Sequence, residues 1–149
     1  MLVRDCMTRN PLTTSPETPV HVALRLMKEK KVRRLPVVDS RGSLVGIVSE
    51  NDLLAASPSA ATTLAVWELP ELLAKITIEK VMTRKVITVN EDTPLEEAAR
   101  IMADNRIGGL PVMAGDALSG IITETDLFKV LLTQLGARRA GVRLTVMVP

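Results

Sequence analysis

The chain has 149 residues, of which 46% are hydrophobic and 24% charged, and its formal net charge is +2. This small charge excludes a strong non-specific attraction to nucleic acid. Two aromatic residues, Trp67 and Phe128, are too few for the stacking platforms of single-strand binders. The sequence shows no membrane-spanning run or signal core, and a single cysteine, Cys6, provides no internal disulfide framework, which favours a globular cytoplasmic protein.

The first predicted helix begins near residue 18, with Thr18 as its N-cap and Pro19 as its first residue. Apolar residues then follow at helical spacing: Val20, Ala23, Leu24 and Met27. Two short apolar segments, 35–39 and 44–48, are predicted strands, and the second is apolar on both faces, as expected inside a sheet. A second helix is predicted to begin at Ser49. The order of elements predicts an α/β unit with helices covering a small sheet.

The same order of elements occurs twice. The nonapeptide GIVSENDLL at 46–54 returns as GIITETDLF at 120–128. Further identities connect Met7-Thr8-Arg9 with Met82-Thr83-Arg84, and Leu35-Pro36-Val37 with Leu110-Pro111-Val112. An internal duplication of this kind predicts two units that pair about a pseudo-twofold axis, each covering the apolar face of the other.

The predicted units are residues 1–56 and 78–135, joined by a linker over 57–77. A helix is expected at VWELPELLAKI (66–76), where Pro70 forces a kink or a restart and Trp67 packs. The tail, 136–149, contains VRLTVMV, which alternates like a strand. A single strand is not stable alone, so this segment either joins a sheet edge or begins a further domain.

Two readings of the repeated nonapeptide stay open. Ser49 with Asp52, and Thr123 with Asp126, resemble capping boxes at helix N-termini. Alternatively, free amides at such a terminus attract phosphate, while the carboxylate accepts hydrogen bonds from two vicinal ribose hydroxyls. The neighbouring apolar residues would then hold an adenine: Ile47, Pro36 and Val37.

The two copies differ just before the Leu-Pro-Val segment. The first copy has Arg33-Arg34 there, and the second has Gly108-Gly109. Guanidinium groups bind phosphate strongly, so the sequence predicts two unequal sites in which these arginines hold most of the phosphate. The alternative is a solvated basic face that continues a run of lysines: Lys28, Lys30 and Lys31.

Six segments in the right order resemble the tandem cystathionine-β-synthase (CBS) domain pair, or Bateman module, over about residues 3–130. They are MTRNPLTTSPETPVHVAL, KVRRLPVVD, GIVSENDLL, MTRKVITVNEDTPLEEAARIM, RIGGLPVM and GIITETDLF. The linker is also similar to that of bacterial acetoin-utilisation-type CBS proteins. In some of these an ACT domain follows, and RLTVMVP resembles its first strand. The implied fold is α/β, with two pseudo-twofold-related βαββα repeats packed sheet to sheet.

The resemblance implies a non-enzymatic regulatory module that binds an adenine nucleotide (AMP, ADP or ATP) between its repeats and forms a homodimer. Asp52 and Asp126 would bind ribose hydroxyls, and Ser49 and Thr123 would contact ribose or phosphate. The remaining ligand-binding positions are adenine contacts, phosphate-facing residues and two prolines: Leu12, Thr13, Ile87 and Thr88; Arg33, Arg34 and Gly109; Pro36 and Pro111.

Other functions remain as alternatives. The chain could be a structural dimerisation module with vestigial clefts, or a sensor of S-adenosylmethionine or NAD(H), and nucleic-acid binding ranks below both. His21 is the one histidine and lacks companions at metal-ligand spacing, and no catalytic motif is present. The sequence leaves open which nucleotide binds, how many clefts fill and which protein is controlled.

Overall fold

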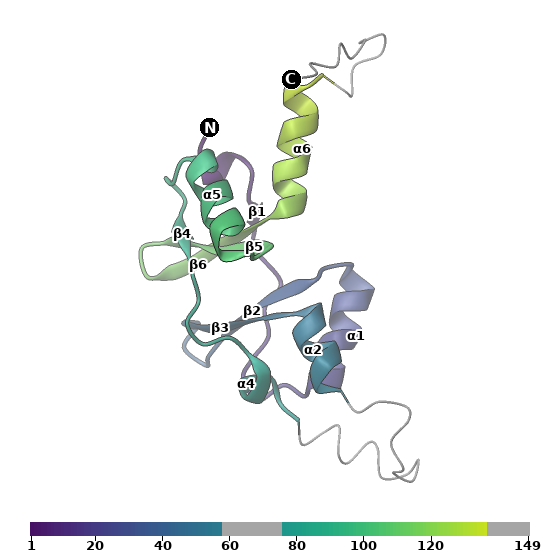
Figure 1. The fold of residues 1–149 in the computed structure, drawn as a ribbon. Coiled ribbons are helices and arrows are strands. Elements are labelled where there is room, and N and C mark those ends of the chain that lie inside the picture. The colour runs from purple at the N-terminus through teal and green to yellow at the C-terminus, as the bar shows by residue number, and fades with distance from the viewer. Residues whose placement is uncertain (58–75, 137–149) are drawn as a thin grey trace.

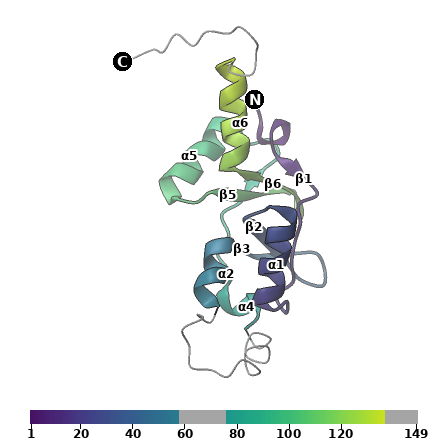
Figure 2. The same cartoon turned by 90° about the vertical axis from the view of Figure 1, so that its right-hand side faces the viewer.

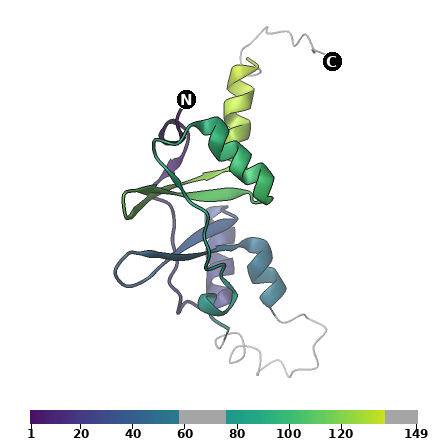
Figure 3. The same ribbon diagram turned by 60° about the vertical axis from the view of Figure 1, so that its left-hand side comes forward.

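The computed structural model describes residues 1–57 and 76–136. Its two sheets face each other at the centre of the molecule, and the helices lie on their outer sides (Figure 1, Figure 3). One sheet has the strand order β1-β6-β5-β4 and the other pairs β2 with β3. This arrangement confirms the predicted α/β class and the packing of two repeats sheet to sheet.

Corresponding elements recur in the two halves of the chain. The first half contains η1 (Val3–Asp5), β1 (Thr8–Arg9), α1 (Val20–Lys30), β2 (Arg34–Val38), β3 (Leu44–Ser49) and α2 (Glu50–Ala56). The second contains α4 (Ile78–Val81), β4 (Val89–Asn90), α5 (Leu95–Asn105), β5 (Gly109–Ala114), β6 (Ala117–Thr123) and α6 (Glu124–Gln134). Figure 2 shows α1 and α2 outside one sheet and α5 and α6 outside the other.

The first long helix of each repeat begins one residue later than predicted. The carbonyl of Pro19 accepts the amide of Ala23 at 3.2 Å, so Pro19 is the N-cap and Val20 the first helical residue of α1. The prediction that Thr18 caps the helix is wrong, because its hydroxyl forms a hydrogen bond of 2.8 Å with Ser15 Oγ and reaches no helix amide. Pro94 occupies the corresponding N-cap position of α5.

Each repeat contributes its leading segment (residues 1–9 in the first half and 76–84 in the second) to the core of the other. Ile78 and Met82 are buried with the side chains of α1, β2, β3 and α2. Val3 is buried with those of β4, α5, β5 and β6. The division into residues 1–56 and 78–135 stays a prediction from the sequence, and each hydrophobic core contains residues from both halves.

Some predicted features lie outside the described residues. These are Trp67, the kink at Pro70 with most of the expected linker helix, and the strand expected at 142–148. In the two described stretches, no helix combines the length and the hydrophobicity that crossing a membrane requires.

The glycines of the central strands allow the leading segments to approach closely. Backbone hydrogen bonds connect Ile47 with Thr83, and Thr8 pairs with Ile121. A Cβ atom at Gly46 would lie 2.6 Å from the Met82 Sδ, and one at Gly120 would lie 2.7 Å from the Thr8 carbonyl oxygen. Both glycines therefore permit a tight approach of neighbouring backbone.

Gly120→Ala is expected to lower the free energy of unfolding by about 1–3 kcal/mol, because its methyl group would meet a backbone oxygen. Gly46→Ala is the matched comparison, since its nearest neighbour is the Met82 side chain and the nearest backbone oxygen, that of Thr83, is farther away at 3.0 Å. Urea unfolding of both variants measures the difference. A larger loss for Gly46→Ala than for Gly120→Ala would contradict this account.

Candidate ligand-binding clefts

The capping box predicted at the start of α2 is present. The Asp52 amide donates to Ser49 Oγ at 3.1 Å, and the Ser49 amide donates to Asp52 Oδ2 at 3.0 Å. One carboxylate oxygen of Asp52 is thus used by the backbone, while the side chain stays exposed. A carboxylate has two oxygens with about four acceptor positions, so capping and ligand binding are compatible.

The corresponding residues at the start of α6 have a related geometry. The amide and the hydroxyl of Thr123 both donate to Asp126 Oδ2, at 2.9 and 3.2 Å. The first helical amides are already bonded, since Glu50 donates to the Arg33 carbonyl at 2.8 Å and Glu124 to the Gly108 carbonyl at 3.0 Å. The first helical amide of each helix is therefore not available to phosphate, whereas the side-chain cations of the clefts suit that role.

Asp52 opens into a cleft of about 460 Å³ between the two repeats, within the ~300–1,000 Å³ typical of small-molecule sites. We call it the Asp52 cleft. Its walls are Arg34, Ile47, Val48, Ser49, Asn51, Asp52, Thr83, Lys85, Val86, Ile87, Arg106, Ile107, Gly108, Gly109 and Pro111. The predicted ribose ligands of the first repeat thus face the predicted adenine segment and the glycines of the second.

A second cleft, of about 450 Å³, contains Asp126. This Asp126 cleft is lined by Thr8, Pro11, Leu12, Lys31, Val32, Arg33, Arg34, Ile121, Thr123, Thr125, Asp126 and Lys129. Here the carboxylate of the second repeat faces the arginines of the first. The pseudo-twofold relation of the repeats accounts for this crossing, because each cleft combines a carboxylate from one repeat with the strand-preceding segment of the other.

Three of the predicted positions lie outside both clefts. Pro36 is buried in β2, and its carbonyl accepts the Thr14 amide at 3.0 Å. Thr13 does not line either cleft, and Thr88 lines a separate hollow with Asn90 and Asp116. Val37, expected beside an adenine, is fully buried in the core of the first repeat, so its side chain is not available to a ligand.

The cations at the ends of the first helices were missed by the sequence reasoning. Lys31 lines the Asp126 cleft and Arg106 the Asp52 cleft. Both residues follow a helix in the left-handed conformation, with φ values of 56° and 54°. Their matching positions in the two copies, next to the segments already assigned to phosphate, were the available signal. Lys85 and Lys129 were also missed, and each adds a cation to one cleft.

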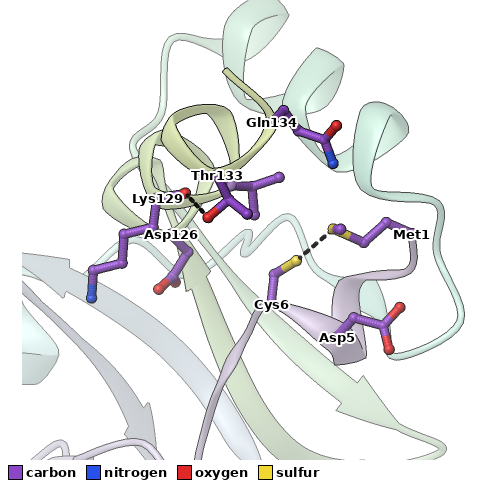
Figure 4. A pocket seen from close by; sticks show the side chains of 8 residues that line it. Met1, Asp5, Cys6, Asp126, Lys129, Thr133 and Gln134 are labelled. Carbon is purple, nitrogen blue, oxygen red and sulfur yellow. Dashed lines mark hydrogen bonds between the residues drawn. The ribbon is translucent and has the colours of Figure 1, made fainter. Parts of the chain in front are cut away.

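A smaller hollow of about 260 Å³, which Asp126 also lines, lies between the N-terminal residues and α6 (Figure 4). There the Cys6 thiol donates to Met1 Sδ at 3.2 Å. Burial, together with the nearby carboxylates of Asp5 and Asp126, raises the pKa of the Cys6 thiol. A protonated thiol is a poor nucleophile and metal ligand, which fits a packing role for Cys6.

Over residues 1–57 and 76–136, no three histidine, cysteine or acidic side chains gather closely enough to hold a metal ion. The polar side chains that line each cleft are one carboxylate, hydroxyl groups and several cations, with the Asn51 amide in addition in the Asp52 cleft. This combination suits a ligand with a diol and an anionic group.

Proteins of known name resemble this chain over most of its length. A CBS domain-containing protein of Dictyostelium discoideum is 32% identical over 136 residues, covering 91% of this chain and 94% of the relative. CBSX2 of Arabidopsis thaliana is 35% identical over 87% of this chain and 63% of its own length. An L-aspartate semialdehyde sulfurtransferase of Methanocaldococcus jannaschii is 32% identical, but this chain spans only 22% of that enzyme.

Solved structures share the fold. A protein of Vibrio cholerae provisionally named as the acetoin utilization protein AcuB is 34% identical, with a TM-score of 0.76 over 96% of this chain and 98% of that one. The CBS domain pair of protein MJ0100, solved with 5-methylthioadenosine and S-adenosyl-L-methionine, is 30% identical with a TM-score of 0.75 over 90% and 98%. CBSX2 in complex with AMP is 36% identical with a TM-score of 0.73 over 89% and 97%.

The likeness to the V. cholerae protein confirms the resemblance to the acetoin-utilisation type. A family model described as the CBS domain matches residues 3–59 and again residues 78–133. These two matches cover both copies of the repeated nonapeptide and both clefts' carboxylates. The chain therefore belongs to the CBS domain family, of which it carries a tandem pair.

Proposed function

We propose that this CBS pair is a non-catalytic regulatory module whose clefts bind adenine nucleotides of the AMP, ADP or ATP class. The observation that carries the proposal is the crossing of the repeats, which places one carboxylate opposite several cations in each cleft. The complexes of CBSX2 with AMP and of the MJ0100 pair with adenosyl ligands support the ligand class.

In the Asp52 cleft, Asp52 would accept hydrogen bonds from the ribose hydroxyls, with Ser49 beside it. Ile47, Ile87 and Pro111 supply apolar surface for the base. In the Asp126 cleft, Asp126 and Thr123 take the ribose, and Leu12 lies on the base side. Arg33 and Arg34 would hold phosphate there, since guanidinium groups pair well with phosphate oxygens.

The signal would be a change in how the repeats sit against each other, which makes the module allosteric. Each cleft has walls from both repeats, so a bound ligand contacts both at once. A ligand shifts such an equilibrium to the extent that it binds one arrangement more tightly than the other. The catalytic activities of longer relatives are not part of this proposal.

Thermal unfolding with AMP, ADP, ATP, NADH and S-adenosylmethionine, each at millimolar concentration, tests the proposal. A nucleotide at 100 times its dissociation constant adds ~2.7 kcal/mol to the free energy of unfolding, or roughly 5–10 °C in midpoint for a chain of this size. A response to S-adenosylmethionine alone that survives Arg33→Gln would favour the alternative sensor. No response to any compound would favour a structural dimerisation module.

We also propose that the module forms a homodimer through α6 and works in the cytoplasm. Three large apolar residues of α6 and its C-cap residue are exposed at helical spacing: Phe128 (61% exposed), Leu131, Leu132 and Leu135. Leu54 of α2, the repeat equivalent of Phe128, is also half exposed. A second copy would bury these side chains, and helices from both repeats would then form a continuous interface.

The cytoplasmic location is supported by the lack of a disulfide framework.

Leu131→Glu is expected to convert a dimer into a monomer, because a charge at the centre of an apolar interface is desolvated without a partner. Sedimentation velocity at micromolar concentration measures the change. Arg100→Glu, at an exposed position of α5, is the matched control and should leave the mass unchanged. A wild-type chain that sediments as a monomer would contradict the dimer.

A further inference from the structure

Arg34 occupies a position that no other charged residue of the described chain shares. It is the first residue of β2 and lines both the Asp52 cleft and the Asp126 cleft. Its neighbour Arg33 lines the Asp126 cleft alone, and Arg106 lines the Asp52 cleft but not the other. The Arg34 side chain is 22% exposed, so it lies between the repeats instead of extending into solvent.

The second repeat provides the space for this side chain. A Cβ atom at Gly108 would collide with the Arg34 guanidinium, and one at Gly109 would lie 2.8 Å from Arg34 Cδ. Any larger residue at these positions would displace the arginine. Arg34 of the first copy therefore crosses over Gly108 and Gly109 of the second in a complementary contact.

The guanidinium is held loosely at its far end. Arg34 Nη2 and Glu124 Oε1 are 3.7 Å apart, and the Glu124 side chain is 54% exposed. An ion pair with one exposed partner and so long a distance contributes little to stability. Phosphate can therefore replace Glu124 as the partner of the guanidinium, from either cleft, at small cost.

The number of cations available to each cleft depends on whether Arg34 is counted with it. With Arg34 counted, the Asp126 cleft has four cationic side chains: Lys31, Arg33, Arg34 and Lys129. The Asp52 cleft then has three: Arg34, Lys85 and Arg106. A guanidinium that turns to a phosphate in one cleft leaves the other with its own cations alone, which reduces its attraction for a second phosphate.

We propose that Arg34 is a cation shared by the two clefts, so that a phosphate-bearing ligand in one cleft weakens the binding of a phosphate-bearing ligand in the other. This inference rests on the proposed function and adds the coupling between its two sites. Because coupling is reciprocal, the order in which the clefts fill does not matter. A ligand without phosphate makes no use of the guanidinium, and its two binding events are independent.

Calorimetric titration of the full chain with ATP and with adenosine tests the shared cation. Asp126→Asn isolates the Asp52 cleft, and Asp52→Asn isolates the Asp126 cleft. In both backgrounds, adding Arg34→Gln is expected to lower ATP affinity by about five-fold or more, whereas Arg33→Gln should do so only with Asp52→Asn. In the wild type, the product of the two ATP binding constants should be at least about five-fold below the product from the isolated clefts. For adenosine the two products should agree.

Glu124→Gln keeps Arg34 in place and removes its competing carboxylate, so it should raise ATP affinity in both isolated clefts. This variant covers the case in which Arg34→Gln fails to fold. An effect of Arg34→Gln in only one background, or equal products for ATP in the wild type, would overturn the shared cation while the nucleotide sensor stands. A wild-type chain that binds neither ATP nor adenosine would overturn the proposed function and this inference with it.

Discussion

The double variant Asp52→Asn, Asp126→Asn is expected to fold and to lose most of the thermal stabilisation that an adenine nucleotide gives the wild type. Asparagine keeps a side-chain oxygen that can accept the Ser49 or Thr123 amide, so both helix starts retain a cap. It removes the charge that strengthens hydrogen bonds to ribose hydroxyls, each worth about 1.5–3 kcal/mol when the acceptor is ionised.

The size of this loss follows from linkage. If affinity falls by roughly 100-fold, a nucleotide concentration that stabilised the wild type by ~2.7 kcal/mol adds only about 0.4 kcal/mol to the variant. Differential scanning fluorimetry with and without ATP measures both values. Asp104→Asn, at an exposed position of α5, is the matched control and should respond like the wild type. An undiminished response in the double variant would mean that the two carboxylates serve as helix caps alone.

Ile78→Ala is expected to lower the free energy of unfolding by about 2–5 kcal/mol, the usual cost of truncating a fully buried isoleucine. Ile78 lies in the second half of the sequence but is buried with the core of the first repeat. The loss of protection from amide hydrogen exchange should therefore concentrate in α1, β2 and β3.

Ile87→Ala is the control for this truncation, because the same side chain is 38% exposed there and its removal leaves no cavity. Its free energy of unfolding should change by well under 1 kcal/mol. Chemical denaturation followed by circular dichroism gives both energies, and hydrogen exchange gives the location. Protection lost first in α5, β5 and β6 of Ile78→Ala would contradict the exchange of leading segments.

Local sequence signals predicted local structure well. Helical spacing of apolar residues after Thr18 predicted α1, and the Ser49–Asp52 pair predicted the capping box at α2. Both features depend on side chains within a few residues of one another. The start of α1 was misplaced by one residue because the hydroxyl of Thr18 has a second partner, Ser15, that propensity does not reveal.

The sequence could not predict which residues of the two repeats lie next to each other. The repeat indicated that Arg33 and Arg34 differ in role from Gly108 and Gly109, but the structure was needed to place them opposite Asp126. An apolar periodicity shows which face of an element is buried, not which repeat covers it. The burial of Val3 in the second repeat and the displacement of Thr88 from the Asp52 cleft are of this kind.

The exchange of leading segments has a consequence for folding during synthesis. When the ribosome has made residues 1–57, the core of the first repeat still lacks Ile78 and Met82. Val3, among the first residues to emerge, finds its partners only after β5 and β6 have been made. Contacts so distant along the chain slow folding. The two halves are therefore expected to reach the native state together, after both have left the ribosome, and neither half is expected to fold when expressed alone.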